Sequence, residues 1–273
     1  MSVVGIDFGN DTCYISVARQ GGIESIANDY SLRETPSYVA FGEKSRTIGV
    51  AAKSGQMTQI KRTFFGFKKL LGRKFSDPQV QSELSRVPYD CGKTEKDEVV
   101  YNINYNGKNK QLSAEQLTAA LFTKLKDIAE TALSVKVNDV VISVPSYFTD
   151  AERRALLDSA KMAGFNVLKL MNDTTATALA YGIYKQDLPE PDKPSRNVVF
   201  VDCGHTGTQV TSSNIIHHYL STKTETNILS RLLPGASTRG SSPCWPAGSL
   251  TAEGETSTRK CANILPRILL SGM

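Results

Sequence analysis

The chain has 273 residues, 40% of them hydrophobic, and a formal net charge of +5. This size and composition predict a soluble globular protein with one good core and part of a second, and no stretch reaches the roughly 18 apolar residues of a membrane span. The segment after Thr211 contains six basic and three acidic residues, so it carries +3 of the net charge. Residues 1–211 therefore have a net charge of only about +2, which argues against a nucleic-acid partner. The five cysteines are scattered without a C-x-x-C pair, so we expect neither disulfides nor zinc, and a location in the cytoplasm or nucleus.

The first stretch with a clear pattern is VVGIDFGNDTCYISVA, residues 3–18. An apolar run leads into Asp7 and Gly9, and a β-prone run follows, so the sequence predicts a strand, a tight turn and a returning strand. An aspartate before a glycine turn commonly accepts hydrogen bonds from the turn amides. A carboxylate in this place can also hold the water shell of a Mg²⁺ ion. The stretch by itself leaves both interpretations open.

Helix and strand patterns alternate through the middle of the chain. Capping boxes are expected where Ser113 precedes Gln116 and where Thr149 precedes Glu152. The expected elements are a helix over 112–133, a strand over 137–144, a helix over 149–164, a strand over 165–170, a helix over 174–184 and a strand from 198. This alternation predicts an α/β sheet with helices packed on its faces.

The last of these strands repeats the opening pattern. VVGIDFGNDTCYIS from Val3 and VVFVDCGHTGTQVT from Val198 share an apolar strand, an Asp-x-Gly turn and a returning strand. Turn chemistry alone gives no reason for the flanking strands to match. Two such turns suit a nucleotide triphosphate, because turn amides form an anion-binding concavity and a nearby carboxylate can hold the waters of Mg²⁺.

Several longer stretches resemble, in content and order, the nucleotide-binding domain of the 70-kDa heat-shock chaperone family. They are GIDFGN, ETPSYVAFGE, GFKKLLGRKFSDP, VISVPSYFTDAERRALLDSAKMAG, LKLMNDTTATALAYGIY and VVFVDCGH, and they span about residues 1–211. Within the family the chain resembles the 110-kDa subfamily, whose members serve as chaperones and nucleotide exchange factors. The resemblance implies an actin-like, ribonuclease H-like α/β fold: a mixed sheet with flanking helices, and ATP and Mg²⁺ in a cleft between two lobes.

The resemblance also implies a division of the chain. Residues 1–188 match lobe I, residues 189–211 match the crossing loop and the first hairpin of lobe II, and the rest of lobe II is largely missing. Residues 212–273 do not resemble the family and are rich in Ser, Thr, Gly and Pro. We expect this tail to be disordered and to come from a shifted reading frame, a retained intron or an alternative exon. Without a second lobe, ATP affinity should be far weaker than that of a two-lobed relative.

Individual site residues follow from the same resemblance. Asp7 and Asp202 match carboxylates near the magnesium waters, and Asp173 matches a glutamate implicated in hydrolysis. Lys68 matches the lysine that reaches the γ-phosphate, although by itself it belongs to a basic stretch that would most simply be a solvated face. The two phosphate loops correspond to Gly9, Asn10, Asp11 and Thr12, and to Gly204, His205, Thr206 and Gly207.

Both loops depart from the members of the family that hydrolyse ATP. Asn10 and Asp11 replace hydroxyl residues and add a negative charge near a polyanion. His205 and Thr206 replace glycines where close backbone approach is needed, and Gln209 replaces an acid. We therefore expect weak or absent ATP hydrolysis.

These features predict an ATP-binding chaperone or nucleotide exchange factor that acts with a 70-kDa heat-shock partner. Unfolded polypeptides would be bound only if the missing domains were present. The alternative is a small-molecule kinase of the actin-like superfamily, which would share both Asp-x-Gly hairpins. Residues 36–110 favour the chaperone, because they resemble its extra subdomain and contain no recognisable sugar site.

Overall fold

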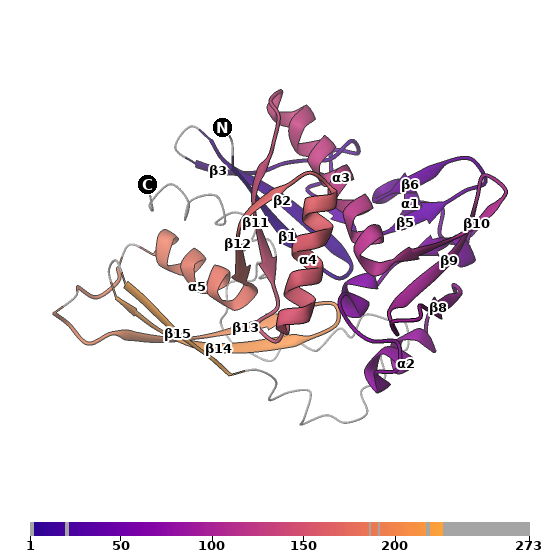
Figure 1. The fold of residues 1–273 in the computed structure, drawn as a ribbon. Helices are drawn as coiled ribbons and strands as arrows, with labels where there is room; N and C mark the ends of the chain where they lie inside the picture. Colours follow the sequence, from indigo (N-terminus) through magenta and orange to yellow (C-terminus); the bar gives the residue numbers. More distant parts are fainter. Residues whose placement is uncertain (1–2, 20–21, 186, 191, 217–218, 226–273) are drawn as a thin grey trace.

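The computed structural model of the chain describes residues 3–19, 22–185, 187–190, 192–216 and 219–225 (Figure 1). The strands are β1 (Val4–Phe8), β2 (Thr12–Arg19), β3 (Gly22–Ser25), β4 (Glu34–Pro36), β5 (Val39–Phe41), β6 (Arg46–Ile48), β7 (Thr63–Phe64), β8 (Cys91–Lys93), β9 (Val99–Tyr105), β10 (Lys108–Ser113), β11 (Asp139–Val144), β12 (Asn166–Asn172), β13 (Arg196–Cys203), β14 (Thr208–Ile216) and β15 (Tyr219–Glu225). The helices are α1 (Val50–Ser54), α2 (Pro78–Leu84), α3 (Ala114–Leu133), α4 (Asp150–Met162) and α5 (Asp173–Tyr184), with 3₁₀ turns at Ile60–Arg62 and Phe67–Leu70. Over these ranges, no helix has the length and apolar character needed to cross a bilayer.

The largest sheet has six strands of mixed direction. Its strand order is β12-β11-β1-β2-β3, and β4 also pairs with β2. β1 and β12 each run parallel to β11, whereas β2 runs antiparallel to both β1 and β3. The strand, turn and strand predicted at the start of the chain are confirmed, and so is a mixed α/β sheet.

Helices cover both faces of this sheet, and β11 shows how the sequence allows this. Val140 and Ile142 belong to the main core, which includes buried residues of α3 and α4. The intervening Val141 belongs to a smaller cluster that contains Ala176 of α5. Because successive strand residues point to opposite faces, a strand covered on both sides needs an unbroken apolar run.

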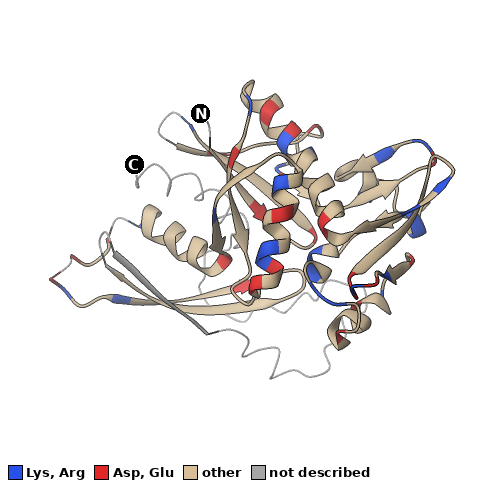
Figure 2. Cartoon of the chain, in the orientation of Figure 1, with Lys and Arg blue, Asp and Glu red and all other residues tan. Residues whose placement is uncertain are grey.

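The two longest helices begin at the predicted capping boxes. Ser113 Oγ accepts from the Gln116 backbone N at 3.3 Å, and Gln116 Oε1 accepts from the Ser113 backbone N at 3.0 Å. Thr149 and Glu152 make the same pair of bonds at the start of α4. The two helices pack against each other, and acidic and basic residues interleave along α4, as expected for a helix with one solvent-facing side (Figure 2).

A second, three-stranded antiparallel sheet, β13-β14-β15, lies on the far side of α5 (Figure 1). The Phe200 ring of β13 meets the Tyr181 ring of α5 in an edge contact, with centroids 5.6 Å apart. Val199 and Val201 point away from this contact and are 64% and 55% exposed. The antiparallel pairing of β13 with β14 confirms the second hairpin predicted from the repeated Asp-x-Gly pattern. Helix α5 lies between this hairpin and the main sheet.

The residues after Thr211 differ in part from the expected disordered tail. β14 continues to Ile216, and β15 pairs with it from Val210↔Glu225 to Ile216↔Tyr219. The prediction of disorder is wrong for 212–216 and 219–225, because cross-strand hydrogen bonds and contacts with α5 provide order that local composition does not. The remainder of the predicted tail, residues 226–273, lies outside the described residues.

Residues 39–113 form the two smaller sheets, β6-β5-β7 and β10-β9-β8, around an aromatic cluster. The Phe64 ring lies 5.0 Å from Tyr89 and 5.6 Å from Tyr101, centroid to centroid. This part of the core carries the 3₁₀ turn Phe67–Leu70 and helix α2. Both elements contribute residues to one wall of the site described next.

Candidate functional site

A cleft of about 710 Å³ lies between the main sheet, helix α2 and the β13–β14 hairpin. Its volume falls within the range of small-molecule sites. All twelve residues selected from the sequence line this cleft, although they come from four separate parts of the chain. They are Asp7, Gly9, Asn10, Asp11, Thr12, Lys68, Asp173, Asp202, Gly204, His205, Thr206 and Gly207.

The two Asp-x-Gly turns have the same construction. A Cβ on Gly9 would lie 2.1 Å from the carbonyl oxygen of Thr12, three residues later. A Cβ on Gly204 would lie 3.2 Å from the carbonyl oxygen of Gly207, also three residues later. Only glycine fits the first turn without a shift of backbone, and a larger residue would crowd the second. The repeat found in the sequence is thus a repeat in three dimensions.

The first turn is held by Ser37, in the loop after β4. Ser37 Oγ donates to the Gly9 carbonyl at 2.9 Å, and the Ser37 backbone N donates to the Asp11 carbonyl at 2.8 Å. The Asp11 carboxylate accepts from Tyr38 Oη at 3.2 Å and from Lys53 Nζ at 3.1 Å. Lys53 therefore balances the negative charge that Asp11 brings to the loop.

Side chains also join the first turn and the main sheet to the second hairpin. Asn10 Nδ2 lies 3.3 Å from His205 Nδ1, across 195 residues of sequence. Gln209 Oε1 accepts from the backbone N and from Oγ of Ser146, at 3.1 and 2.9 Å, and Gln209 Nε2 donates to Asp173 Oδ2 at 3.4 Å. These contacts hold the β13–β14 hairpin against the end of β11 and the start of α5.

Asp7 is a buried carboxylate at the floor of the cleft, only 5% exposed. Its Oδ1 accepts from Ser143 Oγ at 3.0 Å, and its Oδ2 has no hydrogen-bond partner among the described residues. Burial and then the nearby charge of Asp173 raise the pKa of Asp7 to about 7, although Lys68 and Ser143 act in the opposite direction. Asp7 does not bond its own turn amides, so the turn-capping interpretation of this residue is wrong.

Lys68 is buried and does not lie on a solvated basic face. Its Nζ donates to the Phe8 carbonyl and lies 5.2 Å from the Phe8 ring centroid and 5.8 Å from that of Phe148. The adjacent Lys69 pairs instead with Glu83 of α2 at 2.7 Å. The two neighbouring lysines therefore have different surroundings, and Lys68 contacts Phe8, the last residue of the strand that carries Asp7.

The carboxylates of the cleft fit a divalent cation held through water. The negative charges of Asp173 and Asp202 both raise the pKa of Asp7, so each of these two carboxylates lies within electrostatic range of Asp7. Within the described ranges, no three His, Cys, Asp or Glu side chains converge closely enough to ligate a metal directly. The orphaned Asp7 Oδ2 and this excess of negative charge suit a hydrated Mg²⁺, since carboxylates can bind such an ion through its waters.

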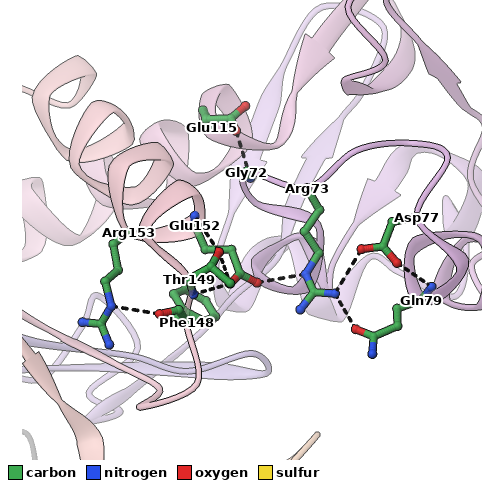
Figure 3. Close-up of polar contacts among 9 residues, drawn as sticks. All are labelled: Gly72, Arg73, Asp77, Gln79, Glu115, Phe148, Thr149, Glu152 and Arg153. Atoms are coloured by element: carbon green, nitrogen blue, oxygen red, sulfur yellow. Dashed lines mark hydrogen bonds and ion pairs between the residues drawn. The ribbon is translucent and has the colours of Figure 1, made fainter.

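Other residues that line the cleft were not selected from the sequence, notably Arg73, Tyr147 and Glu152. Glu152 was expected only as a helix cap, and it also accepts from Arg73 Nε at 2.9 Å (Figure 3). These residues are 79 apart in the sequence, so no local pattern signals their contact. The only available signal was that Arg73 lies in the same basic stretch as Lys68.

Comparison with known proteins identifies the family of this chain. A family model described as Hsp70 protein matches residues 3–224, which extends past the resemblance recognised up to residue 211. The chain is 54% identical over 211 residues to heat shock protein 110 of Caenorhabditis elegans, covering 77% of this chain and 27% of the relative. It is 53% identical over 210 residues to heat shock 70 kDa protein 4L of Homo sapiens, covering 77% and 25%. Heat shock 70 kDa protein 4 of Rattus norvegicus is 52% identical over 210 residues, with the same coverage.

The chain thus spans about a quarter of the length of these curated relatives. The family model covers most of the chain and includes every residue of the two turns, Lys68 and Asp173. On this basis, the chain belongs to the Hsp70 protein family.

Proposed function

We propose that this chain is an ATP-binding module of the heat-shock type, which acts as a chaperone or nucleotide exchange factor with a 70-kDa heat-shock partner. The observation that carries the proposal is the convergence of two matched Asp-x-Gly turns and Lys68 on one cleft. Turn amides and a buried lysine attract phosphate groups. The names of the relatives, heat shock protein 110 and heat shock 70 kDa protein 4L, support the heat-shock part of the proposal.

In this proposal the residues of the chain bind and orient the nucleotide. Gly9–Thr12 and Gly204–Gly207 contact the phosphates, and Lys68 approaches the terminal one. Asp7 and Asp202 hold the water shell of Mg²⁺, which neutralises phosphate charge when it is bound. Asp173 orients the attacking water.

Hydrolysis is proposed to be weak or absent. Asp173 is held by Gln209 Nε2 at 3.4 Å, and its side chain is one methylene shorter than that of a glutamate. The second loop carries His205 and Thr206, whose side chains restrict close backbone approach to a transferring phosphoryl group. Binding of ATP, rather than its turnover, would then be the property that engages the partner.

The proposed affinity for ATP is millimolar. Charged and polar groups line most of the cleft, and few apolar side chains among the described residues are placed to cover a base: Pro145, Tyr147 and Phe148. Nucleotide sites generally need such apolar surface for much of their affinity. The phosphate end of the site is therefore better equipped than the base end.

Nuclear magnetic resonance titration of the 273-residue chain with Mg-ATP tests the binding proposal, because it measures millimolar dissociation constants. Lys68→Ala should raise the dissociation constant by about 10-fold, the scale of one lost charge-assisted contact. Lys69→Ala should change it little, because Lys69 is paired with Glu83. Equal effects of the two substitutions would contradict the role of Lys68.

The partner role needs a separate assay. A 70-kDa heat-shock protein loaded with labelled ADP should release it faster in the presence of this chain, and the two proteins should co-purify. A small-molecule kinase would instead transfer phosphate from ATP to a metabolite in a substrate screen. Transfer without partner binding would favour the kinase and contradict the heat-shock proposal.

A further inference from the structure

Arg73 has an unusual position at the wall of the cleft (Figure 3). Its Nε donates to Glu152 Oε1 at 2.9 Å, and its Nη1 lies 2.5 Å from Gln79 Oε1 and 3.5 Å from Asp77 Oδ2. No hydrogen bond or ion pair joins Nη2 to any of the described residues, and the side chain remains 24% exposed. The guanidinium thus keeps one nitrogen available to a ligand in the cleft.

Glu152 fixes the orientation of this guanidinium. Its Oε2 accepts from the backbone N and from Oγ1 of Thr149, at 2.6 and 2.8 Å, and its Oε1 accepts from Arg73. The Glu152 side chain is only 4% exposed, so both of its oxygens are buried and engaged. A buried carboxylate with both oxygens bonded has little freedom to move, and the planar guanidinium that it holds is equally restricted.

The backbone beside Arg73 is also fixed. Gly72 has a φ of +67°, and its backbone N donates to Glu115 Oε1 at 3.2 Å. A Cβ at Gly72 would lie 2.7 Å from the carbonyl oxygen of Ala151 at the start of α4. Arg73 is therefore held at its backbone and at its guanidinium, which reduces the entropy lost when its free nitrogen binds a ligand.

Tyr147 connects this wall to the second phosphate loop. Its hydroxyl oxygen lies 3.5 Å from the position that a Cβ on Gly207 would occupy. Burial and then the charges of Asp173 and Glu152 raise the pKa of Tyr147, and the charge of Arg73 lowers it. Tyr147 thus lies within electrostatic range of Arg73 on one side and of the second turn on the other.

Among the described residues, the two N–H groups of Arg73 Nη2 have no partner, and two of the three Lys68 donors are likewise free, whereas Lys69 is held in an ion pair. Lys68 Nζ already donates to the Phe8 carbonyl, and Lys69 is paired with Glu83. An arginine that keeps one nitrogen free can still bind a phosphate oxygen, since its donors form a rigid fork.

From this arrangement we infer that Arg73 is a second cationic contact for the phosphate chain of the nucleotide, and that Glu152 positions it. The inference rests on the proposed function, because it assumes that a nucleotide occupies the cleft. It assigns to Arg73 and Glu152 a role toward the ligand, beyond the helix cap and ion pair that they form with each other.

The test is titration of the full 273-residue chain with Mg-ATP and, separately, with adenosine. Arg73→Gln should raise the dissociation constant for Mg-ATP by about 10-fold and leave that for adenosine unchanged, because only the phosphates contact the guanidinium. Glu152→Gln leaves one acceptor oxygen, which cannot accept from Thr149 and from Arg73 at the same time, so it weakens the hold on Arg73 and should raise the Mg-ATP constant by a smaller factor, about 3-fold. Arg154→Gln is the matched control: this arginine is on α4, outside the lining of the cleft, with a side chain 76% exposed, and its removal should change neither constant.

The outcomes separate the inference from the proposed function. If the unaltered chain binds Mg-ATP and Arg73→Gln binds it equally well, the inference is wrong and the proposed function stands. Equal weakening of Mg-ATP and adenosine by Arg73→Gln would show that Arg73 has only a structural role, which also overturns the inference. If the unaltered chain binds no Mg-ATP at all, the proposed function fails and the inference fails with it.

Discussion

Asp7→Asn removes the carboxylate at the floor of the cleft and keeps the size of the side chain. It therefore tests whether the ionised Asp7 destabilises the folded chain because its charge is not compensated by neighbouring residues. The folded chain raises the pKa of Asp7 from 3.8 to about 7. An acid with a raised pKa binds its proton more tightly in the folded state than in the unfolded state. Its favourable contribution to stability is therefore present below pH 3.8 and is lost as the pH rises toward 7.

The size of the effect follows from the two pKa values. Each pKa unit corresponds to about 1.4 kcal/mol, so the ionised carboxylate costs the folded state about 4 kcal/mol at pH 8, and about 3 kcal/mol of this develops above pH 4.5. In Asp7→Asn, Oδ1 can still accept from Ser143. The new NH₂ group takes the place of Oδ2, which had no partner, so it is buried without an acceptor at a cost of about 1–3 kcal/mol. The variant should be about 1–3 kcal/mol more stable than the parent at pH 8 and less stable at pH 4.5.

Urea unfolding followed by circular dichroism at both pH values measures these differences. Asp127→Asn, which replaces an exposed aspartate on α3, should follow the parent protein at both pH values and serves as the control. If Asp7→Asn showed the same dependence on pH as the parent, Asp7 would not be an acid held at raised pKa by burial. Asp7 would then not be an unbalanced carboxylate that favours a cation in the cleft.

Three further predictions concern the parts of the structure around the site. Glu152→Ala should lower the free energy of unfolding by about 3 kcal/mol, because it removes a helix cap and leaves Arg73 without its buried carboxylate partner. Glu152→Gln should lower it by less than half as much, and urea unfolding measures both values. Gly72→Ala should cost at least about 3 kcal/mol in the same assay, because its Cβ would overlap the backbone of α4. Gly66→Ala has a similar positive φ but open space around it, and it should cost only about 1 kcal/mol. In thiol labelling with intact protein, the exposed Cys203 should react before Cys13, because burial raises the pKa of the Cys13 thiol to about 12; faster labelling of Cys13 would mean that the first turn opens readily.

The first hairpin, the two later strands of the main sheet and the helices between them could be predicted from the sequence because their signals are local, whereas β3, β4 and the order of strands in the sheet were not predicted. The capping boxes at Ser113 and Thr149 fix where α3 and α4 begin, since the groups that bond are only three residues apart. The repeated Asp-x-Gly pattern predicted both hairpins. In each turn a Cβ at the glycine would crowd the carbonyl oxygen three residues later, so both copies need glycine at this position. Composition was a weaker guide: β15 is rich in polar residues and was not predicted, since its order comes from pairing with β14.

Contacts between distant residues were decided by the tertiary structure. Asp7 and Ser143 are 136 residues apart, and Asn10 and His205 are 195 apart, so only packing of the sheets brings them together. Lys68 belongs to a basic stretch in the sequence, and only the closure of the core over it shows that it is buried. What the residues by themselves determined was the set of chemical groups and the turns that carry them. Which charges face one another, and whether water reaches them, depended on the fold, because burial and electrostatic range are properties of three-dimensional distance and not of sequence separation.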